Sequence, residues 1–152
     1  MSSFLDTMLA RAKADKQTIV LPEGDDPRTL EAAETILAQD VANLIILGNV
    51  EAIKESGRKL DGATLIDPQG SDLHDEFANT LYELRKHKGM TLEKAAEQVR
   101  DELFFGVLMV KTGRADGMVS GACHSTGDVL RPSLQILKTA PGVKLVSSFF
   151  IM

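Results

Sequence analysis

Residues 116–142 read DGMVSGACHSTGDVLRPSLQILKTAPG. The stretch begins with a short apolar run, Met118–Val119, between two glycines, which is typical of a buried strand that ends in a turn. A segment rich in hydroxyl groups follows at 122–128, and the apolar residues of 129–137 then recur at helical spacing. These residues predict a strand, a polar turn and a helix in succession.

The junction between this turn and the predicted helix is a candidate anion site. The first turn of a helix leaves backbone N–H groups without partners, and the helix dipole adds partial positive charge there. Ser125 and Thr126 can add hydroxyl donors, and Gly127 lets a ligand approach the backbone. Arg131 can offer a bidentate fork to a phosphate. The alternative is an ordinary helix cap, because Asp128 follows Ser125 by three residues, and spacing alone leaves both interpretations open.

Three further apolar runs predict buried strands, namely Thr18–Leu21, Leu44–Leu47 and Thr64–Ile66. Helical patterns alternate with them, and parallel strands need such crossover connections. The sequence therefore predicts a three-layer α/β/α fold with a mostly parallel sheet. The last residues, Val143–Met152, are largely apolar and predict one more strand.

The turn after the first strand resembles the one before the last helix, since both connect a strand end to a helix. Asp26 is the expected cap and Pro27 the first helical residue, where a missing N–H costs little. The two turns could therefore face one ligand. Acidic residues in the first of them would repel an anion, so Arg28 is the candidate binding group there, although it could equally be a solvated side chain.

Other segments carry clear helical patterns. Amphipathic spacing predicts surface helices, and a run that is apolar on every side, flanked by acids and by Lys-Thr-Gly, predicts a buried one. The basic residues that end one of these helices agree with its dipole. The predicted helices are Ser3–Ala14, Arg28–Gln39, Asp72–His87, Leu92–Arg100 and Leu103–Val110.

Composition excludes several classes of protein. The chain has 152 residues and a net charge of -5, which argues against a nucleic-acid binder or a membrane-surface binder. Its one cysteine excludes an internal disulfide, and the absence of an apolar signal region or spanning segment predicts a cytoplasmic protein. Cys123 and His124 are adjacent, and neighbouring side chains rarely ligate one ion with good geometry, so we expect no metal site.

Three stretches together resemble a known enzyme family. They are TIVLPEGDDPRTLEAA at Thr18–Ala33, YELRKHKGMTLEKA at Tyr82–Ala95 and DGMVSGACHSTGDVLRPSLQILKTAPGV at Asp116–Val143. The sequence is similar to the N-terminal portion of the phosphate acetyltransferases, or phosphotransacetylases. Members of that family are roughly twice as long, so the resemblance implies a fragment. Residues 1–143 would form the N-terminal α/β domain, and 144–152 would begin a strand leading into a second domain.

The resemblance implies a two-domain enzyme like isocitrate and isopropylmalate dehydrogenases, commonly a homodimer, with its active site between the domains. Its reaction exchanges an acetyl group between acetyl phosphate and coenzyme A in acetate metabolism, with coenzyme A as a substrate and no bound cofactor. By resemblance Arg85 and Arg131 hold substrate phosphates, while Ser125 and Thr126 line the cleft. The resemblance also makes Arg28 a candidate substrate-binding residue, but it does not assign a specific role to it.

The family's principal catalytic motif lies near the end of the full-length enzyme, so the catalytic residues are left unassigned here and the isolated chain is expected to be nearly inactive. Two alternatives remain. One is an acyl-phosphate enzyme of the same superfamily that acts on butyryl groups. The other is a non-catalytic module that binds coenzyme A or a partner subunit.

Overall fold

The computed structural model describes residues 3–148 and centres on a four-stranded parallel sheet. The strands are β1 (Thr18–Leu21), β2 (Asn43–Leu47), β3 (Thr64–Ile66) and β4 (Gly117–Met118). Their spatial order is β3-β2-β1-β4, and all three pairings are parallel. The predicted parallel sheet is confirmed, because no strand in this sheet pairs with its neighbour as a hairpin.

Helices fill the connections between the strands and most of the chain after β3. The predicted cap at Asp26 is confirmed, since its side chain accepts a hydrogen bond from the Arg28 N–H, and Thr91 caps the helix that follows it by accepting from the Lys94 N–H. The elements are α1 (Phe4–Ala14), α2 (Pro27–Gln39), α3 (Val50–Glu55), α4 (His74–Arg85), the 3₁₀-helix η1 (Lys86–Lys88), α5 (Leu92–Gln98), α6 (Glu102–Lys111) and α7 (Thr126–Ile136).

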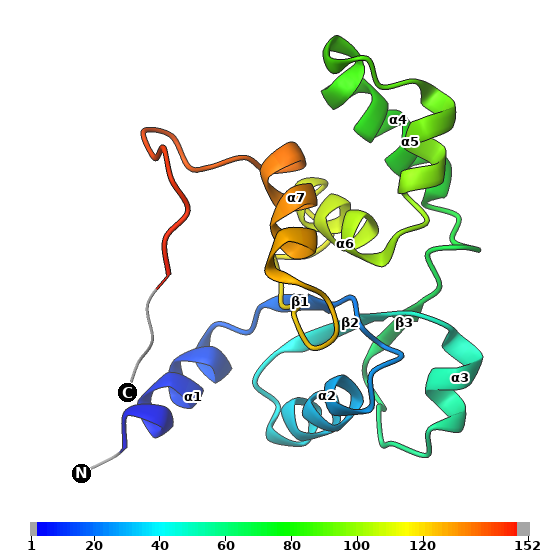
Figure 1. Ribbon diagram of the computed structural model, residues 1–152. Helices are drawn as coiled ribbons and strands as arrows, with labels where there is room; N and C mark the ends of the chain where they lie inside the picture. Colours follow the sequence, from blue (N-terminus) through cyan, green and yellow to red (C-terminus); the bar gives the residue numbers. More distant parts are fainter. Residues whose placement is uncertain (1–2, 149–152) are drawn as a thin grey trace.

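Successive residues of the central strands face opposite sides of the sheet and enter two separate cores. Val20 packs in a core with α4, α5, α6 and α7, whereas Leu21 packs in a core with α2 and α3. Figure 1 shows these two groups of helices on opposite faces of the sheet. The three-layer α/β prediction is therefore confirmed.

Helix α6 is the buried helix that the all-apolar run predicts. Residues Leu103–Met109 are all buried, and Phe105 meets Phe77 of α4 edge to face, with 4.8 Å between ring centroids. At Gly106, an added Cβ would lie 2.8 Å from Met118 Sδ and 3.2 Å from Val20 Cγ1. The helix therefore lies close to the sheet because this residue has no side chain.

Helix α1 lies to one side of the layers in Figure 1, and none of its residues is buried. Ser3 and Asp6 form a capping box at its start. Phe4 and Leu5 expose 57% and 67% of their surface. The predicted amphipathic surface helix is confirmed, but its apolar stripe has no cover among residues 3–148.

Three predictions need correction. The strand expected at Met118–Val119 is Gly117–Met118, and Val119 is 63% exposed, because β4 lies at the sheet edge and turns away after one more hydrogen bond to Val20. The helix expected to run to His87 changes to 3₁₀ geometry at Lys86. Residues 143–148 form no strand, since no neighbouring strand pairs with them, and 149–152 lie outside the described residues.

None of the helices within residues 3–148 is both long enough and apolar enough to cross a membrane.

Candidate functional site

The candidate site lies where the chain changes direction across the sheet. Strand β1 is central, with β2 on one side and β4 on the other, so the connections leaving β1 and β4 diverge. In open α/β sheets such a switch point opens a crevice outside the carboxyl ends of the strands. Two turns meet here, at 22–26 after β1 and at 119–125 after β4, as the sequence led us to expect.

The backbone donors of the second turn already hold an anion, which is the chain's own Glu23. Its Oε2 accepts from the N–H groups of Gly121 and Ala122, both at 2.9 Å. Its Oε1 accepts from the N–H groups of Cys123 at 3.0 Å and His124 at 3.1 Å. Glu23 is 3% exposed. A ligand anion therefore cannot occupy this cradle while Glu23 stays in place.

The cradle also shifts the pKa values of the titratable groups in and around it. Burial favours the neutral form of Glu23, but hydrogen bonds from Cys123, Ala122, His124 and Gly121 outweigh burial and hold the Glu23 pKa well below its usual range. The hydrogen bond to Glu23 in turn raises the pKa of His124. Desolvation of the sulfur and the neighbouring Glu23 raise the pKa of the Cys123 thiol, which disfavours a nucleophilic thiolate.

The start of α7 is a capped helix that still has free donors. Ser125 Oγ accepts from the Asp128 backbone N–H at 3.3 Å and donates to Asp128 Oδ2 at 2.6 Å. The expected N-cap is therefore confirmed. Among residues 3–148, nothing accepts a hydrogen bond from the N–H groups of Thr126 and Gly127. Ser125 and Thr126 are exposed, so these two donors face solvent at the positive end of the helix dipole.

We expect Ser125→Ala to lower the free energy of unfolding by about 1 kcal/mol, because the Asp128 N–H loses its capping acceptor. Urea denaturation of the chain would measure the change. The matched control is Thr126→Ala, since the Thr126 hydroxyl makes no hydrogen bond within residues 3–148. Equal losses in the two variants would contradict the capping role.

Arg28 joins the two turns. Its Nη2 donates to the Ala122 carbonyl at 2.5 Å and to Asp26 Oδ2 at 2.7 Å, while Nε donates to Asp26 Oδ1 at 3.0 Å. The side chain is 71% exposed, so it remains accessible to a ligand. Arg131 is 64% exposed and lies 3.6 Å from Asp128 Oδ1 on the first turns of α7. The structure therefore brings Arg28 to the turn that leads into α7.

A small pocket beside Arg28 contains a polar atom with no partner. It encloses about 250 Å³ and is lined by Leu21, Glu23, Arg28, Thr29, Ala32, Val119, Ser120 and Ala122. Ser120 Oγ is buried there without a hydrogen bond. Such an atom is costly unless a water or ligand completes it. Ser120 was not among the residues predicted from the sequence, although its position directly after a strand at the switch point is a usable signal.

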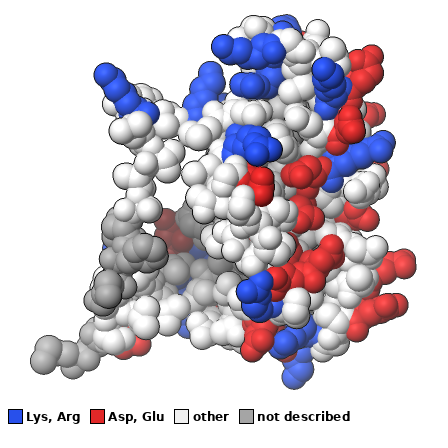
Figure 2. Space-filling view, viewed as in Figure 1, with Lys and Arg blue, Asp and Glu red and all other residues white. Residues whose placement is uncertain are grey.

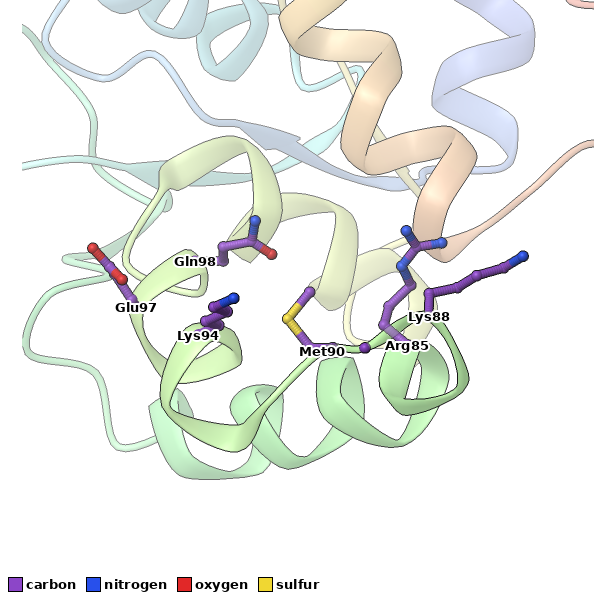
Figure 3. Close-up of a pocket in the computed structure, with 7 residues that line it drawn as sticks. Arg85, Lys88, Met90, Lys94, Glu97 and Gln98 are labelled. Atoms are coloured by element: carbon purple, nitrogen blue, oxygen red, sulfur yellow. The ribbon is translucent and has the colours of Figure 1, made fainter.

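Arg85 lies in a different pocket, formed by the ends of α4 and α5. This pocket of about 500 Å³ is lined by Arg85, Lys88, Gly89, Met90, Lys94, Glu97 and Gln98. Figure 3 shows Arg85 and Gln98 on either side of Met90. Arg85 Nε and Gln98 Oε1 are both buried without a hydrogen-bond partner. These two atoms can serve as a donor and an acceptor for a polar ligand.

The surface around this second pocket is basic. Lys86, His87 and Lys88 form η1 at its edge, and Figure 2 shows Lys and Arg side chains at this upper end of the molecule. His87 is exposed, in agreement with a solvated residue. Of the five candidate binding residues, the structure places Arg28, Ser125, Thr126 and Arg131 around the turn before α7 and on its first turns, and Arg85 in this separate pocket.

The sequence matches one family along almost its whole length. The family model described as "Phosphate acetyl/butaryl transferase" matches residues 3–152. A phosphate acetyltransferase from Thermoanaerobacterium thermosaccharolyticum is 53% identical over 152 residues, covering 99% of this chain and 46% of that protein. The phosphate acetyltransferase of Acetivibrio thermocellus gives the same identity and coverage. The chain thus spans about half the length of the curated relatives it matches.

Solved structures agree with the sequence matches. A phosphotransacetylase from Streptococcus pyogenes superimposes with a TM-score of 0.89 at 39% identity, covering 95% of this chain and 46% of that one. The EutD phosphotransacetylase from Staphylococcus aureus gives a TM-score of 0.83 at 39% identity, over 93% of this chain and 44% of that one. Sequence and fold therefore point to the same relatives.

Proposed function

Because the chain belongs to the phosphate acetyl/butaryl transferase family, we propose that it takes part in acetyl transfer between acetyl phosphate and coenzyme A. The observation that carries this proposal is the 53% identity to phosphate acetyltransferases, which extends over 99% of the chain. Both substrates carry phosphate groups, and the basic and N–H donor groups described above can meet such anions in an otherwise acidic protein.

The proposed binding groups fall into two clusters. Arg85 offers a buried Nε that lacks a partner, in a pocket large enough for part of a nucleotide. Ser125, Thr126 and Arg131 belong to the cap and first turns of α7, whose free N–H groups would favour a phosphate. Arg28 lines the small pocket that also contains Ser120, and it would add a further positive charge.

The reaction itself needs further groups beyond those that bind the substrate phosphates. The coenzyme A sulfur attacks the acetyl carbon, a C–S bond forms, and the C–O bond to phosphate breaks as phosphate leaves. A base must take the thiol proton, and donors must stabilise the developing oxyanion. We assign no base among the described residues. Cys123 and His124 are engaged with Glu23, and His87 is a solvated residue of η1.

The larger architecture is also part of the proposal. We expect the complete active site to form between this α/β unit and a second one, as in the two-domain fold of isocitrate and isopropylmalate dehydrogenases. We further expect a cytoplasmic homodimer that binds coenzyme A as a substrate and needs no bound cofactor. The exposed apolar stripe of α1, with Phe4 and Leu5, gives such an assembly a surface to cover.

The direct experiment mixes the purified chain with acetyl phosphate and coenzyme A and follows loss of the free thiol. Butyryl phosphate in a parallel reaction tests the acyl group, because the family description includes both. Heat denaturation with and without coenzyme A tests binding alone. Thermal protection without turnover supports a coenzyme A-binding module. If the chain shows no turnover and coenzyme A gives no thermal protection, the proposal for this chain is contradicted.

We expect Arg85→Ala to weaken binding of coenzyme A by about 10–100-fold, because a charge-assisted hydrogen bond contributes roughly 1.5–3 kcal/mol. Thermal protection as a function of coenzyme A concentration measures the change. Arg131→Ala should act in the same direction. Arg11→Ala on the surface of α1 is the control for loss of one positive charge, and an equal effect there would remove both arginines from the site.

A further inference from the structure

The side chains of Glu23, Cys123 and His124 converge on one point beside the second turn. Cys123 Sγ lies 3.5 Å from Glu23 Oε1 and 3.6 Å from His124 Nδ1. His124 Nδ1 lies 2.8 Å from the same Glu23 Oε1. The proposed transfer reaction assigns no role to this triangle of sulfur, nitrogen and oxygen. From its geometry, we propose that Glu23, Cys123 and His124 bind a zinc-like divalent cation.

The triangle has nearly the dimensions of one face of a tetrahedral zinc site. Zinc bonds of about 2.3 Å to sulfur and about 2.0–2.1 Å to nitrogen and oxygen place sulfur about 3.5 Å from each of the other ligands, and nitrogen about 3.3 Å from oxygen. Two of the three observed separations match this without movement. The third, between His124 Nδ1 and Glu23 Oε1, must open by about 0.5 Å.

The ligand set also selects the kind of ion. Thiolate, imidazole and carboxylate together suit zinc and similar transition metals, whereas magnesium prefers oxygen ligands in an octahedral arrangement. We expected no metal site from the sequence, because Cys123 and His124 are adjacent, and neighbouring side chains rarely ligate one ion with good geometry. Glu23 supplies a third ligand from a turn 100 residues away along the chain.

The site is held in place before any ion arrives. Four backbone N–H groups fix the Glu23 carboxylate, and the turn that supplies those groups also carries Cys123 and His124. Glu23 is buried at the base of the site, while Cys123 is exposed, so an ion can enter from solvent. Binding would therefore need little reorganisation of the chain.

A second carboxylate supports the ligating histidine. His124 Nε2 lies 3.7 Å from Glu102 Oε1 at the start of α6. Histidines that bind metal through one ring nitrogen commonly donate the other N–H to a carboxylate, which fixes the tautomer and the ring orientation. Glu102 lies close to this position for an ion at Nδ1, and an approach of its carboxylate from 3.7 Å to hydrogen-bonding distance would complete the pair. Glu102 and Glu23 also give the site negative potential, with Arg28 as a nearby positive group.

When the ion binds, it takes the place of the Cys123 thiol proton and of the hydrogen-bond contacts between the three side chains. The Cys123 S–H bond breaks, an S–Zn bond forms, and the proton passes to solvent. The imidazole of His124 binds as a neutral ring, with its proton on Nε2 facing Glu102. The Glu23 oxygen exchanges its contacts with the thiol and with the ring nitrogen for a bond to the ion. Water fills the fourth position, which faces the exposed side of the site.

The test is titration of the metal-free full chain with Co²⁺, whose bond to a thiolate produces a charge-transfer absorption in the near ultraviolet. We expect one equivalent of Co²⁺ to produce this band and Zn²⁺ to abolish it by displacement, whereas Mg²⁺ leaves it unchanged. Absence of the band with Co²⁺ at large excess and neutral pH would overturn the proposal. Neither result depends on transferase activity, so this test is independent of the proposed function.

Variants assign the ligands. Cys123→Ser should abolish the band, because the sulfur ligand is lost. His124→Gln should weaken Co²⁺ binding by at least about 10–100-fold, the range found when a residue that supports a metal ligand is removed. Glu102→Gln should weaken Co²⁺ binding by about 10–100-fold, because it removes the carboxylate next to His124. His87→Gln changes an exposed histidine away from the site, so this control should bind Co²⁺ as the parent chain does. Circular dichroism establishes that each variant is folded. A band of unchanged affinity in folded His124→Gln would show a lone thiolate and would refute the site.

Discussion

Replacing Glu23 by alanine is expected to lower the free energy of unfolding by about 3–5 kcal/mol, because several hydrogen bonds to one buried carboxylate disappear together. Four backbone N–H groups, at Gly121, Ala122, Cys123 and His124, lose their acceptor. The His124 ring also loses its partner at 2.8 Å. Urea denaturation of the metal-free chain would measure the loss.

Two further variants sharpen this experiment. Glu23→Gln keeps one acceptor oxygen and the shape of the side chain, so its loss should be smaller than that of alanine. Glu55→Ala removes an exposed carboxylate from α3 and should change the free energy of unfolding by no more than about 0.5 kcal/mol. If Glu23→Ala behaved like Glu55→Ala, the cradle around Glu23 would not exist in solution.

Gly24→Ala is expected to destabilise the chain by about 2–4 kcal/mol, because the space beside this residue is already filled. An added Cβ would lie 2.4 Å from the Leu47 carbonyl oxygen and 2.9 Å from side-chain carbons of Ile46 and Ile53. The Gly24 N–H also donates to that carbonyl at 2.9 Å, so the backbone cannot move away without losing this bond. Thermal or urea unfolding would measure the effect.

Gly70→Ala is the matched control for Gly24→Ala. No heavy atom lies within 4 Å of a Cβ added at Gly70, and its backbone is not in the left-handed region. Alanine there should be neutral or slightly stabilising, because it restricts the unfolded chain. Similar losses of stability at both positions would show that crowding of residue 24 against β2 is not the reason why Gly24→Ala destabilises the chain.

The layered fold was predictable because local patterns and tertiary packing agree. The apolar runs that form β1 and β2 pack into cores on both faces of the sheet, and Leu65 and Ile66 of the edge strand β3 are partly buried against the same two cores. These runs therefore lack polar alternation and stand out in the sequence. Pro27 after Asp26 and Gly89 after the basic turn mark helix ends through their own backbone chemistry. These signals need no knowledge of distant residues.

The candidate site was predictable only in part, because its central contact is not local. Glu23 reads as an ordinary polar turn residue, and its role depends on N–H groups 98–101 residues further along the chain. The same holds for Ser120, whose hydroxyl is buried without a partner in a pocket lined by residues that are distant in the sequence, among them Leu21 and Arg28. Ser125 was predictable, since a capping residue and its partner are three residues apart.

The arginines show the same limit. Their charge and helix position are readable from sequence, but the structure places Arg85 and Arg28 in separate pockets. The strand expected at 143–152 was wrong over 143–148, because an apolar run becomes a strand only where another strand can pair with it. Leu145 and Val146 instead remain exposed.

The long sequence separation across the Glu23 cradle bears on the order in which the chain assembles. Strand β1 meets β2 after a crossover of 25 residues, from Thr18 to Asn43, whereas β4 joins β1 only after about 98 residues, from Ile19 to Gly117. Closing the longer loop costs more chain entropy, so β1, β2 and β3 have the advantage in forming first. The turn after β4 would then dock last, and the Glu23 carboxylate would exchange its hydrating water for the backbone N–H groups of that turn only at this step. A contact made after the folding barrier governs how fast the native state opens rather than how fast it forms. Glu23 is therefore expected to affect the unfolding rate, and so the lifetime of the folded chain, more strongly than it affects the folding rate.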